Sequence, residues 1–299
     1  MADVSEQWDK LTREQFQRID DDFLDTFRAP GSSNKFVAWD PFEPSSRYLK
    51  FLLFSTALRQ SEAFFAAYQK IEHRQLGRPL SVSVAGCDVD ADYMAAVEEW
   101  EFLRQSGGLT GVTRVVEIGG GFGRTCHTLL TLCEGIEEYV IVDLEPMLRL
   151  SEGYLKRVGF GGKVRFVSNE DHAQIDALNA DLVINIDSFQ EMPRPVISFY
   201  MDHIVARSKR FYCKNPTGKY LPGTIGQPDL SPAKLMDVFK LGYCQDVIDI
   251  FDDGALRTAR EAFLKAYCPP TSSGNAYRVV GTRPMDLFPY FQHALYARE

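Results

Sequence analysis

The stretch TRVVEIGGGFGRTCHTLL, residues 113–130, decides the fold of this chain. It opens with a short apolar run, Val115 to Ile118, which predicts a buried strand. Glycines follow at positions 119, 120, 121 and 123, and the chain then continues with the apolar spacing of a helix. Glycine lets the backbone approach a ligand closely, and the start of a helix offers unpaired N–H groups. The stretch therefore predicts the first βα unit of a nucleotide-binding fold.

The spacing of the glycines separates two kinds of nucleotide. The dinucleotide fingerprint G-x-G-x-x-G needs its third glycine at the position of Arg124, so that pattern fails. An acidic residue followed by alternate glycines stands here instead: Glu117, Gly119, Gly121 and Gly123. This pattern resembles the first motif of class I S-adenosylmethionine-dependent methyltransferases. The resemblance implies a Rossmann-like, seven-stranded α/β sheet with S-adenosylmethionine as cofactor. The cofactor is cationic, so a carboxylate at the end of the strand is a suitable neighbour. The alternative is a glycine turn that binds no ligand.

Composition and net charge limit the classes of partner that this protein could bind. The chain has 299 residues, 45% hydrophobic and 25% charged, which suffices for one large α/β domain and an appendage. Its net charge is -8 and no Lys/Arg cluster appears, which favours a small-molecule acceptor over a nucleic acid. The start MADVSEQWDK is polar, and the apolar runs near it are too short for a bilayer. Six cysteines without C-x-x-C pairs predict packed thiols. We expect a reduced, cytoplasmic protein with no membrane partner.

Residues 1–110 are expected to form a helical extension ahead of a methyltransferase domain at 111–299. Apolar spacing predicts helices at 12–28, where Thr12 is the candidate cap, and at 47–73 and 89–104. The stretch GRPLSVSVAGCD, 77–88, is expected to be irregular. The extension is a candidate lid, wall of the substrate site or homodimer surface, and a plain packing layer is the alternative.

A second acidic residue is predicted to bind the cofactor. Residues 139–142 form a second apolar run, and Asp143 and Leu144 follow it. An acid at this strand end, about 20 residues after the glycines, suits the two hydroxyls of a ribose. Capping of the helix predicted at 146–158 is the alternative. After a third strand within 163–172, the resemblance implies adenine contacts from Ser168 and Asn169. The polar residues 169–172 are more simply explained by helix capping than by a metal site, so no metal is predicted.

The stretch ALNADLVINIDSFQEMP, 177–193, predicts a fourth strand at 182–186 followed by the acceptor site. Asp187 begins the turn at the carboxyl end of this strand, where ligands bind in open α/β sheets, and it is expected to contact both cofactor and acceptor. A hydroxyl is a poor nucleophile until a base takes its proton, whereas a phenol or an amine needs less help. The candidates for the base are Glu191, His172 and Asp187.

The motifs together resemble a narrower family, described as sugar O-methyltransferases. They are EIGGGFGR, YVIVDLE, DLVINIDSFQEM and FYCKN, and the resemblance covers roughly residues 90–285. The element Ser188, Phe189, Glu191 and Met192 points to this family. The resemblance implies O-methylation of a sugar hydroxyl in natural product biosynthesis. N-methyl or metal-dependent O-methyl transfer, aminopropyl transfer and a non-catalytic binding module remain alternatives.

The C-terminal part is expected to complete the sheet. We predict a helix at 194–209, a fifth strand at 210–215, a strand at 244–252, a helix at 255–265 and the last strand at 276–284. The resemblance implies that the final strand is inserted antiparallel. The Gly- and Pro-rich loop 216–232 would lie over the acceptor, with Lys214, Asn215 and Tyr220 as candidate contacts and a plain surface loop as the alternative.

Overall fold

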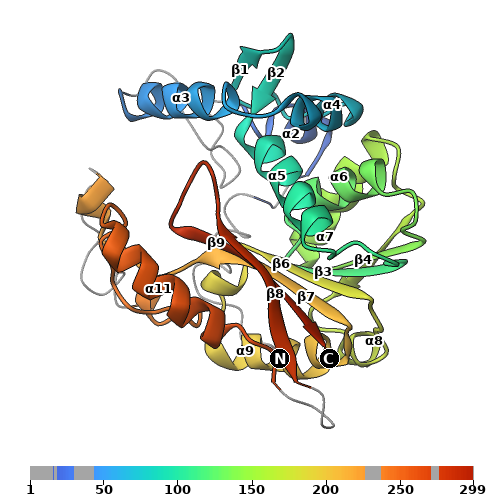
Figure 1. Cartoon of the computed structure of the whole chain (residues 1–299). Coiled ribbons are helices and arrows are strands. Elements are labelled where there is room, and N and C mark those ends of the chain that lie inside the picture. The colour runs from blue at the N-terminus through green and yellow to red at the C-terminus, as the bar shows by residue number, and fades with distance from the viewer. Residues whose placement is uncertain (1–15, 17–18, 30–43, 226–236, 271–275, 299) are drawn as a thin grey trace.

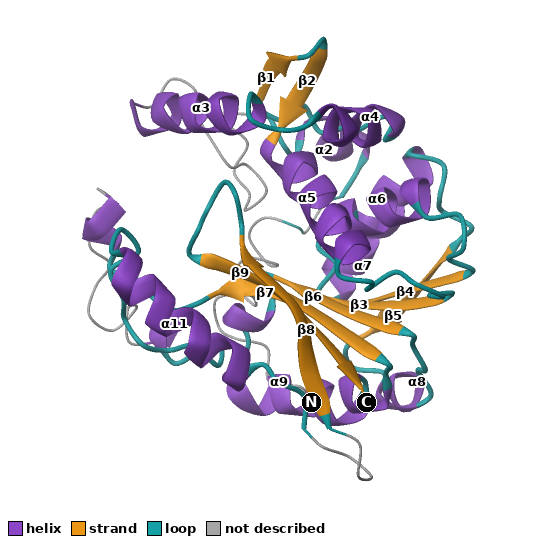
Figure 2. Cartoon of the chain, in the orientation of Figure 1, coloured by secondary structure: helices purple, strands orange, loops and turns teal. Residues whose placement is uncertain are grey.

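The fold is built on a seven-stranded sheet (Figures 1 and 2). The computed structural model describes residues 16, 19–29, 44–225, 237–270 and 276–298. The strands are β3 Arg114–Ile118, β4 Glu138–Asp143, β5 Val164–Ser168, β6 Leu182–Ile186, β7 Arg210–Pro216, β8 Tyr277–Pro284 and β9 Phe291–Arg298.

The order of the strands, β5-β4-β3-β6-β7-β9-β8, confirms the predicted Rossmann-like, seven-stranded α/β sheet. The strands β3 to β7 are parallel to one another, and β9 lies antiparallel between β7 and β8. Strand β3 pairs with β4 on one side and with β6 on the other, so the strand order reverses at β3. Ligands bind in open α/β sheets at the carboxyl ends of the strands beside such a reversal.

Helices cover both faces of the sheet, as Figures 1 and 2 show. One face carries α5 Ala91–Gln105, α6 Arg124–Leu132 and α7 Glu145–Arg157, and the other carries α8 His172–Asp176, α9 Arg194–His203 and α11 Asp253–Ala266. Successive side chains of a strand point to opposite faces. Val115 accordingly joins one apolar cluster, and Val116 joins the other. Strands buried on both faces explain the nearly continuous apolar runs in the sequence.

The N-terminal part differs from the prediction at two points. The elements are α2 Asp21–Thr26, α3 Pro44–Ala57, α4 Glu62–Lys70, β1 Ser81–Val84 and β2 Cys87–Asp90. The single helix predicted at 47–73 is wrong, because Ser61 caps a new helix by accepting a hydrogen bond from the backbone N–H of Phe64 at 3.0 Å. The irregular segment predicted at 77–88 is also wrong, because it contains most of an antiparallel hairpin. Its turn residues Ala85 and Gly86 have φ of 52° and 73°, as a tight hairpin requires.

The helix predicted at 12–28 lies partly outside the described residues. Thr12 belongs to that part, and the described portion contains α2, whose N-terminus is capped by Asp20. Phe16, Leu24 and Phe27 are buried, as their spacing predicts. None of the helices within the described ranges is long and apolar enough to cross a membrane.

The prediction for the two C-terminal strands is wrong, because the terminal strand pair lies further along the chain than the sequence predicts. Residues 244–252 form only a single bridge, between Lys219 and Val247, because aspartates interrupt the apolar run at 246, 249 and 252. The terminal pair is instead β8 and β9, and the last strand is 291–298 rather than 276–284. The predicted helix 194–209 ends at His203 and is followed by a 3₁₀ turn, Val205–Arg207.

Candidate functional site

The glycine loop joins β3 to α6 in a conformation that favours glycine. Gly119, Gly121 and Gly123 have φ of 74°, 59° and 93°. Gly119 lies directly against the turn after β6, since a Cβ at this position would come within 2.2 Å of the Ser188 Oγ. A Cβ at Gly123 would come within 3.0 Å of Leu155. The loop is therefore closely packed against two other parts of the chain.

Asp143 connects the end of β4 to this loop. The N–H of Gly121 donates to the Oδ2 of Asp143 at 3.0 Å, and the N–H of Leu144 donates to its Oδ1 at 2.8 Å. Asp143 is half-buried and pairs in register with Ser168 of β5. The N–H of the buried Asn169 donates to the backbone carbonyl of Asp143 at 3.0 Å. The structure thus brings five of the predicted cofactor residues to one edge of the sheet.

Glu117 lies beneath the glycine loop. Its side chain is buried and its Oε2 accepts a hydrogen bond from the Tyr139 hydroxyl at 2.8 Å. A Cβ built on Gly120 would lie 3.4 Å from the same oxygen. Burial raises the pKa of Glu117 to about 8, against the hydrogen bond from Tyr139 and the charge of Arg124, which lower it. Burial therefore disfavours the charged carboxylate that the sequence argument expected.

The turn after β6 carries the acceptor candidates. Asp187 is exposed and has φ of 56°, a conformation that is uncommon for a non-glycine residue. Its N–H donates to the carbonyl of Lys214 at 2.8 Å, and the side chain of Gln190 donates to its Oδ1. The buried Asn185 donates to the carbonyl of Ile118 at 3.0 Å, which ties this turn to the end of β3.

Lys219 adds a positive charge to this turn, and the sequence argument did not identify it. Its side chain is buried, and its Nζ donates to the carbonyl of Gln190 at 3.1 Å. Burial lowers the pKa of Lys219, and the charges of Glu191 and Asp187 act against that shift. Glu191, Asp187 and Lys219 therefore interact electrostatically. A lysine in a Gly- and Pro-rich loop carries no sequence signal that would have singled it out.

Two tyrosines lie next to the same turn. The rings of Tyr220 and Tyr290 are 5.5 Å apart and nearly perpendicular. Burial raises the pKa of Tyr290, and the neighbouring Tyr220 and the charge of Asp187 raise it further. Tyr220 was a predicted substrate contact, whereas Tyr290 comes from the β8–β9 connection. The sequence argument missed Tyr290 because that strand pair was misplaced.

His172 has a different environment from Asp187 and Glu191. It is exposed on α8, and its ring packs against Phe199 of α9 with centroids 5.0 Å apart. The preceding Asp171 caps α8 by accepting from the N–H of Gln174 at 3.0 Å, as the capping interpretation predicts. Among the described residues, no group of three His, Cys, Asp or Glu side chains could hold a metal ion.

Lys214 and Asn215, which the sequence predicts as acceptor contacts, are buried and bond to other interior side chains. Lys214 is buried and forms an ion pair with Glu99 of α5, which also holds Arg124 through two hydrogen bonds of 2.9 and 3.0 Å. Asn215 is buried and donates to the side chain of Asn185 at 2.8 Å. These residues fix the ends of β7 and β6, which positions the turn that carries Asp187.

Comparison with known proteins gives similarity of fold. No protein-family model matches the chain, and no curated protein matches it. The mitomycin 7-O-methyltransferase MmcR is 12% identical, with 86% of this chain and 69% of that chain covered and a TM-score of 0.42. The O-methyltransferase TomG from Streptomyces achromogenes, solved in complex with S-adenosylmethionine, is 14% identical, with 86% and 100% covered and a TM-score of 0.41. PigF, solved with S-adenosylhomocysteine, is 13% identical, with 85% and 72% covered and a TM-score of 0.39. Values this low establish no function, which must come from the side chains of the site.

Proposed function

We propose that this protein is an S-adenosylmethionine-dependent methyltransferase that methylates a hydroxyl of a small molecule. The observation that supports this most is the hydrogen bond from Gly121 to Asp143, which places a carboxylate against a glycine loop where the strand order reverses. The loop has the acidic-x-G-x-G-x-G spacing of the methyltransferases and lacks the third glycine of a dinucleotide site, because Arg124 stands there.

The residues at this edge fit the parts of the cofactor. A carboxylate has about four acceptor positions, so Asp143 can hold backbone N–H groups and also accept from ribose hydroxyls. Leu144, Ser168 and Asn169 lie next to it and would surround the adenine. The backbone of Gly119, Gly121 and Gly123, with Glu117 beneath it and Asp187 across from it, would hold the amino acid end.

The cofactor, when bound, supplies a methyl group on a positively charged sulfur. The protein must align the acceptor oxygen with that methyl, and orientation alone can contribute much of the rate. Transfer of that methyl would require the acceptor hydroxyl to give its proton to a base of the protein. Asp187 and Glu191 are the candidates on the turn after β6. His172 is a weaker one, because it packs against Phe199.

The acceptor class is the finer part of the proposal. Carboxylates, the buried Lys219 and two tyrosine rings suit a polyhydroxylated acceptor such as a sugar or a sugar-containing natural product, since each can hydrogen-bond to hydroxyls. The Ser188–Met192 element supports the same class through its resemblance to sugar O-methyltransferases. We assign the acceptor-facing wall, and a candidate homodimer surface, to residues 1–110, and the cofactor domain to 111–299.

Calorimetry tests the cofactor assignment. S-adenosylmethionine is titrated into the wild type, Asp143→Ala and the control Asp171→Ala, which removes a carboxylate that only caps α8. We expect binding to the wild type and the control and a loss of at least tenfold in Asp143→Ala, since hydrogen bonds to charged groups contribute roughly 1.5–3 kcal/mol. Equal affinity in all three proteins would contradict the assignment.

Turnover separates the remaining alternatives. Release of S-adenosylhomocysteine is followed with panels of sugars, glycosides, phenols and amines, with and without a chelator. Turnover on hydroxylated sugars that resists chelation supports the proposal. Turnover confined to amines, or turnover lost with the chelator, would favour N-methyl or metal-dependent transfer. Cofactor binding without any turnover would favour a non-catalytic binding module.

A further inference from the structure

The N-terminal segment reaches the glycine loop directly. Phe122 is the only residue other than glycine in 119–123, and its side chain is 2% exposed. Its ring packs edge-on against Phe27, with centroids 5.4 Å apart, and against Tyr154 of α7 at 5.0 Å. Among the described residues, Phe27 therefore brings to this ring a contact from residues 19–29, which lie outside the sheet domain. The docked segment therefore helps to bury the only side chain of the loop.

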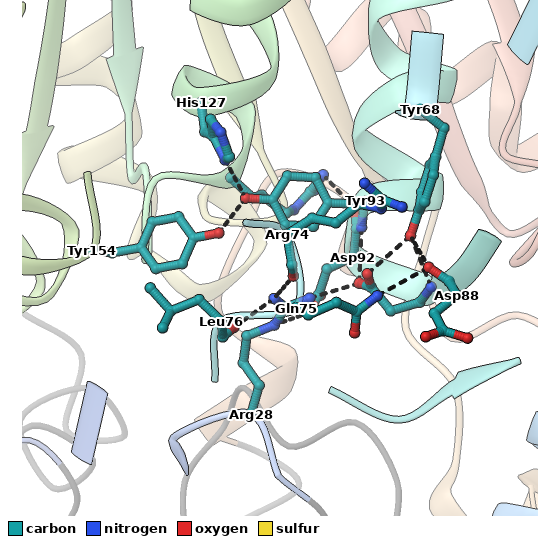
Figure 3. Close-up of polar contacts among 12 residues, drawn as sticks. Arg28, Tyr68, Arg74, Gln75, Leu76, Asp88, Asp92, Tyr93, His127 and Tyr154 are labelled. Carbon is teal, nitrogen blue, oxygen red and sulfur yellow. Dashed lines mark hydrogen bonds and ion pairs between the residues drawn. The ribbon is translucent and has the colours of Figure 1, made fainter. Parts of the chain in front are cut away.

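Arg28, the residue after Phe27, is held by the network of polar contacts drawn in Figure 3. Its guanidinium carbon lies 5.1 Å from the centroid of the Phe122 ring. The guanidinium is fully buried and pairs with Asp90 at 2.6 Å and with Asp92 at 3.1 Å. It also donates to the backbone carbonyls of Arg74 and Leu76 at 2.7 and 2.9 Å. A buried charge with these four partners favours one position of its backbone, because moving the side chain would break several of these contacts in a buried site.

Gly77 provides the space through which this segment passes. The N–H of Arg28 donates to the carbonyl of Gly77 at 2.8 Å. A Cβ at Gly77 would come within 2.8 Å of Phe27 Cε1 and 2.9 Å of Arg28 Cδ, and its φ is 88°. Residues 19–29 are thus held on two sides, by the glycine loop at Phe122 and by the backbone at Gly77.

The loop needs this support for an entropic reason. Glycine loses more conformational freedom on ordering than any other residue, and four of the five loop residues are glycine. Phe122 is the only side chain that the loop itself can pack, in addition to the contacts that its backbone makes with Ser188, Leu155 and Asp143. We propose that Phe27 and Arg28 are positioning residues for the glycine loop, so that affinity for the cofactor depends on the docking of residues 19–29. The cofactor part of this inference rests on the proposed function.

Amide hydrogen exchange tests the positioning without cofactor. The N–H groups of Gly119, Gly121 and Gly123 all have acceptors, at 2.8, 3.0 and 2.9 Å, so their exchange reports the order of the loop. We compare the wild type with Phe27→Leu and with Phe263→Leu, an equally buried residue on the other face of the sheet. We expect exchange in the loop to be about fivefold faster in Phe27→Leu only, because of the three aromatic pairs that this variant loses the one with Phe122 acts on the loop itself.

The cofactor arm then uses the same three proteins. In Phe27→Leu the dissociation constant for S-adenosylmethionine is expected to rise about fivefold, and in Phe263→Leu it should stay unchanged. Loop exchange that is the same in Phe27→Leu as in the wild type would overturn the proposal, as would equal effects of both variants. If the wild type binds no cofactor, the proposed function fails, but the exchange result still decides whether the segment positions the loop. Should Phe27→Leu fail to fold, Phe122→Leu probes the same contact from the loop side, with the same expected exchange and the same refuting outcome.

Discussion

Glutamine in place of Glu117 should change how stability depends on pH. Burial raises the pKa of Glu117 to about 8 in the folded protein, compared with an ordinary value of 4.5. Between these two values the folded state binds more protons than the unfolded state. The stability that this group contributes is therefore fully present below pH 4.5 and is lost as the pH rises through 8.

The magnitude follows from the difference in pKa. Each pH unit within that window corresponds to about 1.4 kcal/mol of unfolding free energy, so the wild type should lose about 4 kcal/mol through this group between pH 5 and pH 8. Glutamine has nearly the same shape and can still accept from the Tyr139 hydroxyl, but it does not titrate. The stability of Glu117→Gln relative to the wild type should therefore rise by that amount over the same range.

Urea unfolding at pH 5, 6, 7 and 8 measures this difference. Glu145→Gln serves as the control, because the side chain of Glu145 is 63% exposed and its replacement should give a difference that does not vary with pH. A flat difference for Glu117→Gln as well would refute the reasoning, since it would mean that Glu117 is ionised in the folded protein across this range.

Three further outcomes are expected. Asp187→Gly should stabilise the protein by about 1 kcal/mol in thermal unfolding, because it removes a side chain from a residue with φ of 56°, and it should lower methyl transfer. Destabilisation would show that the lost hydrogen bond from Gln190 outweighs the relieved strain. Gly119→Ala should destabilise by about 2 kcal/mol or more, because its Cβ would meet the Ser188 Oγ at 2.2 Å, and Gly119→Ala combined with Ser188→Gly should recover part of that loss. Burial lowers the pKa of His293 well below 6.5, so its contribution to stability is present above about pH 6.5 and is lost as the pH falls. The decline in melting temperature from pH 6.5 to pH 5 should therefore be smaller in His293→Gln than in the wild type. An equal decline in both proteins would argue against a neutral buried His293.

The sequence was most informative where local pattern and chemistry agree. Apolar runs ending in glycine or aspartate predicted β3, β4 and β6 within a residue or two, because strands buried on both faces need such runs. The proximity of Gly121 and Asp143 could also be predicted, since the carboxyl ends of adjacent parallel strands meet at one edge.

The remaining features depend on contacts between distant segments. The β1–β2 hairpin was missed because Ala85–Gly86 is not among the usual turn dipeptides. Strand β9 was missed because it lies in the interior beside β7 and needs no alternating pattern. Lys219 and Tyr290 approach the turn after β6 only once β7 and β9 are paired, so no spacing in the sequence connects them.

The short β8–β9 connection, residues 285–290, contacts helix α5 at one end and the segment that follows β7 at the other. Asp286 donates its N–H to Glu98 of α5 at 2.9 Å, and the carbonyl of Tyr290 accepts from Thr217 at 2.9 Å. Met285 and Leu287 of this connection are buried in the apolar core, so exchange without loss of packing is confined to the stretch that carries Tyr290. Substitutions at Tyr290 should therefore alter the choice of acceptor while the nucleoside-binding edge stays intact.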